Sequence, residues 1–123
     1  MTQCIMVGLG GFVGAVCRYL FGLIPLGTDR FPLGTFLINL VGAVLIGAIS
    51  AVWELNPHFD RNILLLLTVG LCGGFTTFST FTLESLGLIE KGRVGAAAAY
   101  MLLSVSFCLL GVMIGRGAVR AIL

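Results

Sequence analysis

Residues 70–82 carry a regular series of aromatic and hydroxyl side chains. Phe75, Phe78 and Phe81 recur every third residue, and Ser79 and Thr80 lie between them. A benzene ring has a negative face and a positive edge, so ring edges turned into a pore could replace water around a small anion while the hydroxyls donate hydrogen bonds. The alternative is an apolar helix face whose hydroxyls bond to the preceding turn. Spacing alone leaves both interpretations open.

The same stretch contains residues that disfavour a continuous helix. Gly73 and Gly74 are adjacent, and the β-branched Thr76 and Thr77 follow closely. Such residues form helix poorly. We expect a break near the middle of this apolar segment, where the freed carbonyl groups cannot reach water. A neighbouring subunit or a small hard cation such as sodium or magnesium could satisfy them, because these ions prefer oxygen ligands.

Isolated polar residues occur in three other apolar segments. Arg18 lies near a helix end, where it either snorkels to the interface or provides a positive field. Asn39 lies deep in its segment and must bond to another helix or line a wet path. Thr35 lies one turn before it on the same face, and Tyr100 and Ser104 are also one turn apart. Together they form a candidate track of neutral hydrogen-bond donors.

Acidic groups at membrane depth are scarce. Glu84 is the one candidate for a carboxylate that gains and loses a proton inside the membrane, and its role stays open. No serine–histidine–acid set is present, and His58 falls in a predicted loop. We therefore expect no enzymatic activity.

The composition identifies the solvent for which these elements are built. Hydrophobic residues make up 59% of the 123 residues, charged residues 10%, and the mean hydropathy is +1.14. Soluble domains carry about 25% charge. A membrane-spanning helix needs about 20 apolar residues, and four segments qualify. We predict an all-α protein with a single four-helix transmembrane domain over residues 1–123, with helices at about 3–25, 33–53, 62–88 and 94–115.

Small residues are expected to let these helices approach closely. Glycines at GxxxG spacing permit close helix packing in lipid, where no hydrophobic drive brings helices together. The cysteines have no CxxC spacing and no nearby histidine, so we expect small buried apolar residues and not a metal site. The glycine pairs are Gly10 with Gly14, Gly70 with Gly74 and Gly111 with Gly115, and the cysteines are Cys4, Cys17, Cys72 and Cys108.

The loop charges do not fix an orientation in the membrane. In a four-helix topology one side carries Arg61, Arg116 and Arg120, and the other carries Arg30, Lys91 and Arg93. The positive-inside bias is therefore nearly absent. Either a partner sets the direction, or the chain inserts both ways and pairs antiparallel, which gives a two-fold axis in the membrane plane.

Several motifs resemble the Fluc (CrcB-type) fluoride channels, and the resemblance covers essentially the whole chain. It implies a passive, fluoride-selective channel in a bacterial inner membrane, with fluoride and lipid as partners and no nucleic acid. It also implies an antiparallel dual-topology homodimer with two pores and a third helix broken at mid-membrane. The motifs are Gly10-Gly11, Gly14-Ala15 and Arg18-Tyr19; Gly34-Thr35, Asn39 and Gly42; and the run from Gly73 to Phe81.

The resemblance also implies roles for individual residues. The rings of Phe78 and Phe81 would coordinate fluoride by their edges, and Arg18 would supply positive charge in a vestibule. A structural sodium ion at the dimer interface would be held by the carbonyls of Gly73 and Thr76. The fluoride pathway would further be lined by Asn39, Thr35, Ser79, Thr80, Tyr100 and Ser104.

Two other functions remain open from the residues alone. Small multidrug exporters can also be four-helix, dual-topology dimers, but they need an acid in the first helix that this chain lacks. A structural membrane subunit without transport activity is the second alternative.

Overall fold

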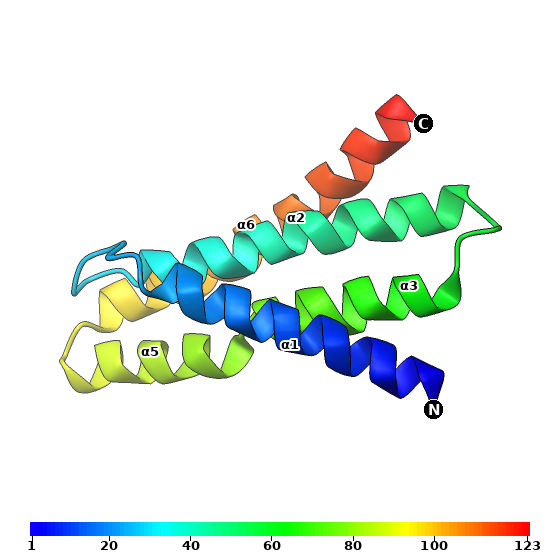
Figure 1. Cartoon of the computed structure of the whole chain (residues 1–123). Helices are drawn as coiled ribbons and strands as arrows, with labels where there is room; N and C mark the ends of the chain where they lie inside the picture. The colour runs from blue at the N-terminus through cyan, green and yellow to red at the C-terminus, as the bar shows by residue number, and fades with distance from the viewer.

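The computed structural model describes all of residues 1–123, and every element in it is helical. Figure 1 shows the N-terminus, the C-terminus and the turn after α2 at one end of the bundle, with the other two turns at the opposite end. The elements are α1 (Thr2–Gly22), α2 (Leu33–Leu55), α3 (Arg61–Leu65), the π-helix η1 (Leu66–Cys72), α4 (Gly73–Phe75), α5 (Phe78–Glu90) and α6 (Val94–Ile122).

Four of the helical stretches are long and apolar enough to cross a membrane: α1, α2, the stretch from Arg61 to Glu90, and α6. The prediction of an all-α protein with four such helices is confirmed. Two ends differ from the expected bounds. Helix α1 stops at Gly22, because the residue before Pro25 disfavours helical backbone. Helix α6 continues to Ile122, where Arg116 and Arg120 reach Glu54 at 2.6 and 2.8 Å.

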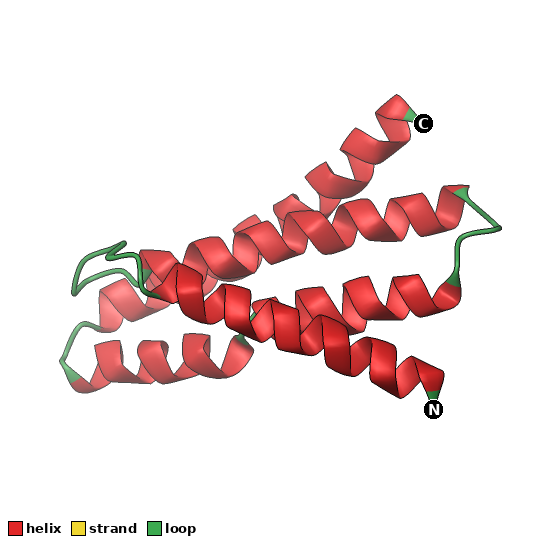
Figure 2. Cartoon of the chain, viewed as in Figure 1, coloured by secondary structure: helices red, strands yellow, loops and turns green.

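The third stretch is assembled from several pieces. Asp60 caps the start of α3, its carboxylate accepting from the amides of Asn62 and Ile63. After η1 and α4, Thr76 and Thr77 have extended backbone (φ −78°, ψ 157° and φ −148°, ψ 115°), and α5 begins at Phe78. We call Thr76 and Thr77 the extended segment; Figure 2 shows the non-helical stretch between α4 and α5.

Glycines allow two helix pairs to make backbone contact. A Cβ atom on Gly14 would lie 2.2 Å from the carbonyl oxygen of Leu71, so α1 packs directly on η1 and α4. A Cβ atom on Gly115 would lie 2.1 Å from the carbonyl oxygen of Val44, so α6 packs as closely on α2. The close packing expected from the glycine pattern is therefore present within one chain.

Most of the apolar surface of the chain points outward. Only 19 of 123 residues are buried, and large apolar side chains such as Phe12 and Leu102 are about 70% exposed, at 72% and 69%. This arrangement suits a protein surrounded by lipid. Cys4 and Cys17 on α1 are exposed, so the expectation of buried cysteines is wrong for these two in the single chain, whereas Cys72 is buried.

Candidate functional site: a groove and a polar cavity

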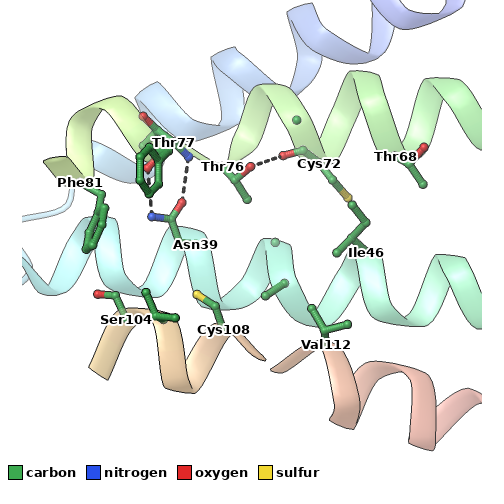
Figure 3. Close-up of a pocket in the computed structure, with 15 residues that line it drawn as sticks. Asn39, Ile46, Thr68, Cys72, Thr76, Thr77, Phe81, Ser104, Cys108 and Val112 are labelled. Carbon is green, nitrogen blue, oxygen red and sulfur yellow. Dashed lines mark hydrogen bonds between the residues drawn. The ribbon is translucent and has the colours of Figure 1, made fainter. Parts of the chain in front are cut away.

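A groove of about 430 Å³ lies between α2, the third stretch and α6; we call it the central groove. Figure 3 shows side chains from all three pointing into it. Six of the residues to which the sequence analysis assigned a role in a site line this groove. They are Asn39, Gly73, Thr76, Phe78, Phe81 and Ser104.

Asn39 forms a two-way hydrogen bond with the backbone of the extended segment. Its Nδ2 donates to the carbonyl oxygen of Thr77 at 3.1 Å, and the amide of Thr77 donates to its Oδ1 at 2.8 Å (Figure 3). The backbone of Thr77 thus has partners although it belongs to no helix. Asn39 meets the requirement that backbone polar groups inside a membrane be satisfied within the protein.

Among the carbonyl groups that the interruption releases from helical bonding are those of Gly73 and Thr76. In a continuous α-helix the amide of Thr77 would donate to the carbonyl of Gly73, but here it donates to Asn39. The amide of Thr80 would likewise donate to the carbonyl of Thr76, but it donates to the hydroxyl of Thr77 at 3.2 Å. The carbonyls of Gly73 and Thr76 therefore lose their helical partners beside the groove. Two such oxygens suit a small hard cation.

The phenylalanines of α5 differ in exposure. The ring of Phe81 is 7% exposed and packs against the ring of Tyr100, with centroids 5.2 Å apart. Phe78 is 74% exposed, and its ring centroid lies 5.5 Å from that of Phe81. The ring of Phe78 thus lies at the open side of the groove, and the ring of Phe81 lies deeper in the protein.

The hydroxyl groups at the start of α5 form a cluster around Thr77. The hydroxyl of Thr77 donates to that of Thr80 at 3.0 Å and lies 3.3 Å from that of Ser79. Because the Thr80 hydroxyl accepts this bond, its own O–H can donate a hydrogen bond to another group. The sequence did not single out Thr77 as a site residue, although the structure makes it the N-cap of α5. A threonine directly before a helix was the available signal.

Ser104 lines the central groove, and its hydroxyl has no partner in the protein. The residue is 5% exposed, and its Oγ is the single buried side-chain oxygen or nitrogen atom that makes no hydrogen bond. Buried polar groups are normally bonded, so an orphaned one asks for a ligand or water. Two other serines donate back to their own helix instead: Ser50 to the carbonyl of Gly47 at 2.8 Å and Ser85 to the carbonyl of Phe81 at 2.7 Å.

A second, more polar cavity of about 310 Å³ lies beside the connection between α1 and α2; we call it the polar cavity. It is lined by Arg18, Thr35, Thr80 and Glu84. Thr77 lines both this cavity and the central groove, so the extended segment separates the two. Arg18 turns inward here, and its Nε donates to the carbonyl of Gly74 at 3.0 Å.

Glu84 joins two residues of the expected donor track. Its carboxylate accepts from the hydroxyl of Thr35 at 2.8 Å and from that of Tyr100 at 2.7 Å. The sequence left the role of Glu84 open, because residues 35, 84 and 100 lie on three different helices. Ser79 and Tyr100 line neither cavity. Ser79 contacts Thr77, and Tyr100 bonds to Glu84, and both of these partners line the polar cavity.

No group of three or more His, Cys, Asp or Glu side chains is placed to hold a metal ion. The groups here that could hold a cation are backbone oxygens. The fold and the site together define a small multi-pass membrane protein whose polar groups gather around an interruption in its third stretch.

The chain belongs to the family described as "CrcB-like protein, Camphor Resistance (CrcB)", which matches residues 5–116. It is 44% identical to the fluoride-specific ion channel FluC of Phocaeicola vulgatus over 94% of this chain and 96% of that one. It is 39% identical to the protein of that name from Ruminiclostridium cellulolyticum, over 99% and 95%. It is 41% identical to FluC 1 of Nitrobacter hamburgensis, over 98% of each chain. The chain is thus a multi-pass integral membrane protein.

Proposed function

We propose that this protein is a fluoride-selective ion channel that exports cytoplasmic fluoride passively down its electrochemical gradient. The names of its relatives support this function. The structural observation that carries it is the buried, unpartnered hydroxyl of Ser104, a residue that lines the central groove together with Phe81. Channel transport involves no covalent chemistry, so no enzymatic activity is proposed.

Weak-acid chemistry explains why a passive channel is enough. Hydrogen fluoride crosses lipid as a neutral molecule and ionises in the less acidic cytoplasm of a bacterial cell. The trapped anion then leaves through the channel in the inner membrane, driven also by the inside-negative potential. Selectivity over chloride comes from a narrow path of directional donors and ring edges that suits a small, strongly hydrated ion.

The functional unit is proposed to be an antiparallel, dual-topology homodimer with two pores, in which each chain contributes one four-helix domain. The balanced loop charges support this pairing. The open side of the central groove also supports it, because Phe78 is 74% exposed there and a pore needs an enclosing wall. In this arrangement the extended segment lies at mid-membrane.

The fluoride path is proposed to run from the polar cavity to the central groove. Arg18 places positive charge at its mouth, and Thr77 lies where the two cavities meet. The proposed lining residues are Thr35, Asn39, Phe78, Thr80, Phe81 and Ser104, and Ser79 and Tyr100, which line neither cavity, are proposed to support them from behind. Glu84 joins the hydroxyls of Thr35 and Tyr100, so it orients two donors of this path.

A structural sodium ion is proposed at the dimer interface. The carbonyls of Gly73 and Thr76 fit this role, because the amides that would occupy them in a helix donate to Asn39 and Thr77 instead. When bound, sodium would neutralise the partial negative charge of these oxygens. The chain's own contribution is to keep both carbonyls turned away from helical bonding.

The decisive experiment is fluoride efflux from liposomes that contain only this purified protein, with chloride as the paired control. Voltage-driven fluoride efflux without chloride leak is the expected result. Silence toward both ions, from protein shown to be folded, would reject the channel and leave a proton-coupled multidrug exporter or a subunit without transport activity.

Replacing Phe81 with isoleucine is expected to lower fluoride flux about tenfold. The substitution keeps an apolar side chain of similar size but removes the ring edge, an interaction of about 1.4 kcal/mol. Flux per protein in liposomes measures the effect, and cross-linking checks that the dimer persists. Phe12→Ile, on the outward face of α1, is the matched control. Equal flux in the two variants would remove the ring of Phe81 from the path.

Ser104→Ala is expected to lower flux without lowering stability. A hydroxyl that donates to an anion contributes about 1.5–3 kcal/mol, so flux should fall at least roughly tenfold. The same hydroxyl has no partner in the protein, so its loss should leave the melting temperature unchanged or slightly higher. Ser50→Ala, which removes a hydroxyl bonded to the carbonyl of Gly47, is the control. A loss of stability with unchanged flux would give Ser104 a structural role only.

A further inference from the structure

Helix α1 holds the third stretch by direct backbone contact. A Cβ atom on Gly14 would lie 2.8 Å from the amide nitrogen of Phe75, and one on Gly74 would lie 2.6 Å from the carbonyl oxygen of Gly11. Two helices this close leave no room for side chains between them. The position of α4 is therefore fixed relative to α1, and a side chain on the same face of α1 can reach the backbone just before the extended segment.

Arg18 is that side chain, one turn after Gly14. Its Nε donates to the carbonyl oxygen of Gly74 at 3.0 Å. In a continuous helix this carbonyl would accept from the amide of Phe78, which here begins α5. Arg18 thus supplies from another helix the donor that the interruption removes.

Neighbouring carbonyls of α4 consequently have different surroundings. The carbonyl of Gly74 accepts a hydrogen bond from Arg18 on α1, whereas the residue Gly73 is exposed and lines the central groove. Successive peptide planes are linked through a single Cα atom, so fixing the plane after Gly74 restricts the plane before it. The hydrogen bond of Arg18 therefore limits the directions in which the carbonyl of Gly73 can point.

We infer that Arg18 is a positioning residue for the cation site as well as a positive charge in the polar cavity. Its Nε holds Gly74, and through Gly74 it holds the Gly73 carbonyl in the direction that a cation requires. This inference rests on the proposed sodium site. It assigns different roles to two properties of one side chain: the N–H at Nε positions the backbone, and the positive charge acts in the polar cavity.

Two substitutions separate these properties. In Arg18→Gln the amide nitrogen follows Cδ directly, as Nε does in arginine, so the N–H donor is kept and the charge is lost. In Arg18→Lys the charge is kept, but the amine lies one atom further along the chain and no donor remains at the Nε position. Arg61→Lys, at the start of α3, controls for the general effect of an arginine-to-lysine change.

The measurements are sodium affinity and fluoride flux for each variant. Sodium affinity is obtained from the melting temperature of the purified protein titrated with sodium chloride against N-methylglucamine chloride, because a cation that binds the folded state raises this temperature. We expect Arg18→Lys to bind sodium about tenfold more weakly, the effect of one lost hydrogen bond. We expect Arg18→Gln to keep the wild-type sodium affinity but to conduct fluoride several-fold more slowly, since the steering charge is gone.

Equal sodium affinity in the wild type and Arg18→Lys would overturn the positioning role, and so would a loss of sodium affinity in Arg18→Gln. If Arg18→Lys does not fold, Arg18→Met takes its place, because it removes both the Nε donor and the charge, and wild-type sodium affinity in that variant would overturn the positioning role. No sodium effect in the wild type would reject the cation site and this inference with it, whereas fluoride flux in liposomes tests the channel separately.

Discussion

Asn39→Asp is expected to lower fluoride flux about a hundredfold. The new carboxylate would lie in the central groove. Its repulsion of a fluoride ion passing at ~5 Å costs about 3 kcal/mol at an effective dielectric constant near 20. The substitution also removes the Nδ2 donor and sets a carboxylate oxygen against the carbonyl of Thr77. Stability should therefore fall as well, by about 3 kcal/mol.

Liposome efflux and thermal unfolding measure the two effects of this substitution separately. Asn56→Asp is the matched control, because the side chain of Asn56, directly after α2, forms only one exposed hydrogen bond, to the carbonyl of Val52. The control should change neither quantity much. Full flux in Asn39→Asp would take Asn39 out of the fluoride path, and wild-type stability would contradict its role as partner of the extended segment.

Gly14→Ala is expected to destabilise the protein by about 3 kcal/mol although alanine is the better helix former. The new methyl group would lie 2.2 Å from the carbonyl oxygen of Leu71, and backbone cannot move aside as a flexible side chain can. Helix α1 would have to separate from η1 and α4. The Arg18–Gly74 bond would then break, so flux should fall with stability.

Gly8→Ala provides the control on the same helix, because no atom lies within 4 Å of a Cβ atom at that position. We expect it to stabilise the protein slightly, by about 0.5–1 kcal/mol, through helix propensity. Thermal unfolding in detergent, followed by efflux from liposomes, compares the pair. Similar melting temperatures for the two variants would mean that α1 can shift on the third stretch without cost.

Composition and periodicity predicted the features that depend on solvent and on local sequence. The four apolar spans follow from the lengths between charged clusters, and close helix packing follows from the glycine spacing, although the sequence did not predict which helices would meet. These features are predictable because lipid requires apolar surface and because only glycine allows backbones to touch.

The partners of the polar groups could not be predicted in the same way. Residues 73–77 were recognisably poor helix formers, yet the two glycines remain helical in α4 and the extended backbone falls on Thr76 and Thr77. The reason is tertiary, since Asn39 on α2 bonds Thr77 across 38 positions of sequence. Glu84 was likewise read as an isolated acid, because its partners Thr35 and Tyr100 lie on other helices.

The order of the partners along the chain bears on how this structure is made. A growing chain emerges from the ribosome with its N-terminus first. Arg18 and Asn39 both precede Gly74 and Thr77, the residues whose backbone they bond. When the ribosome delivers the third stretch to the membrane, both partners have already been synthesised. The peptide groups of Gly74 and Thr77, which have no helical partners, thus emerge after the side chains that bond them, and a chain with these helices in reverse order would lack that protection during insertion.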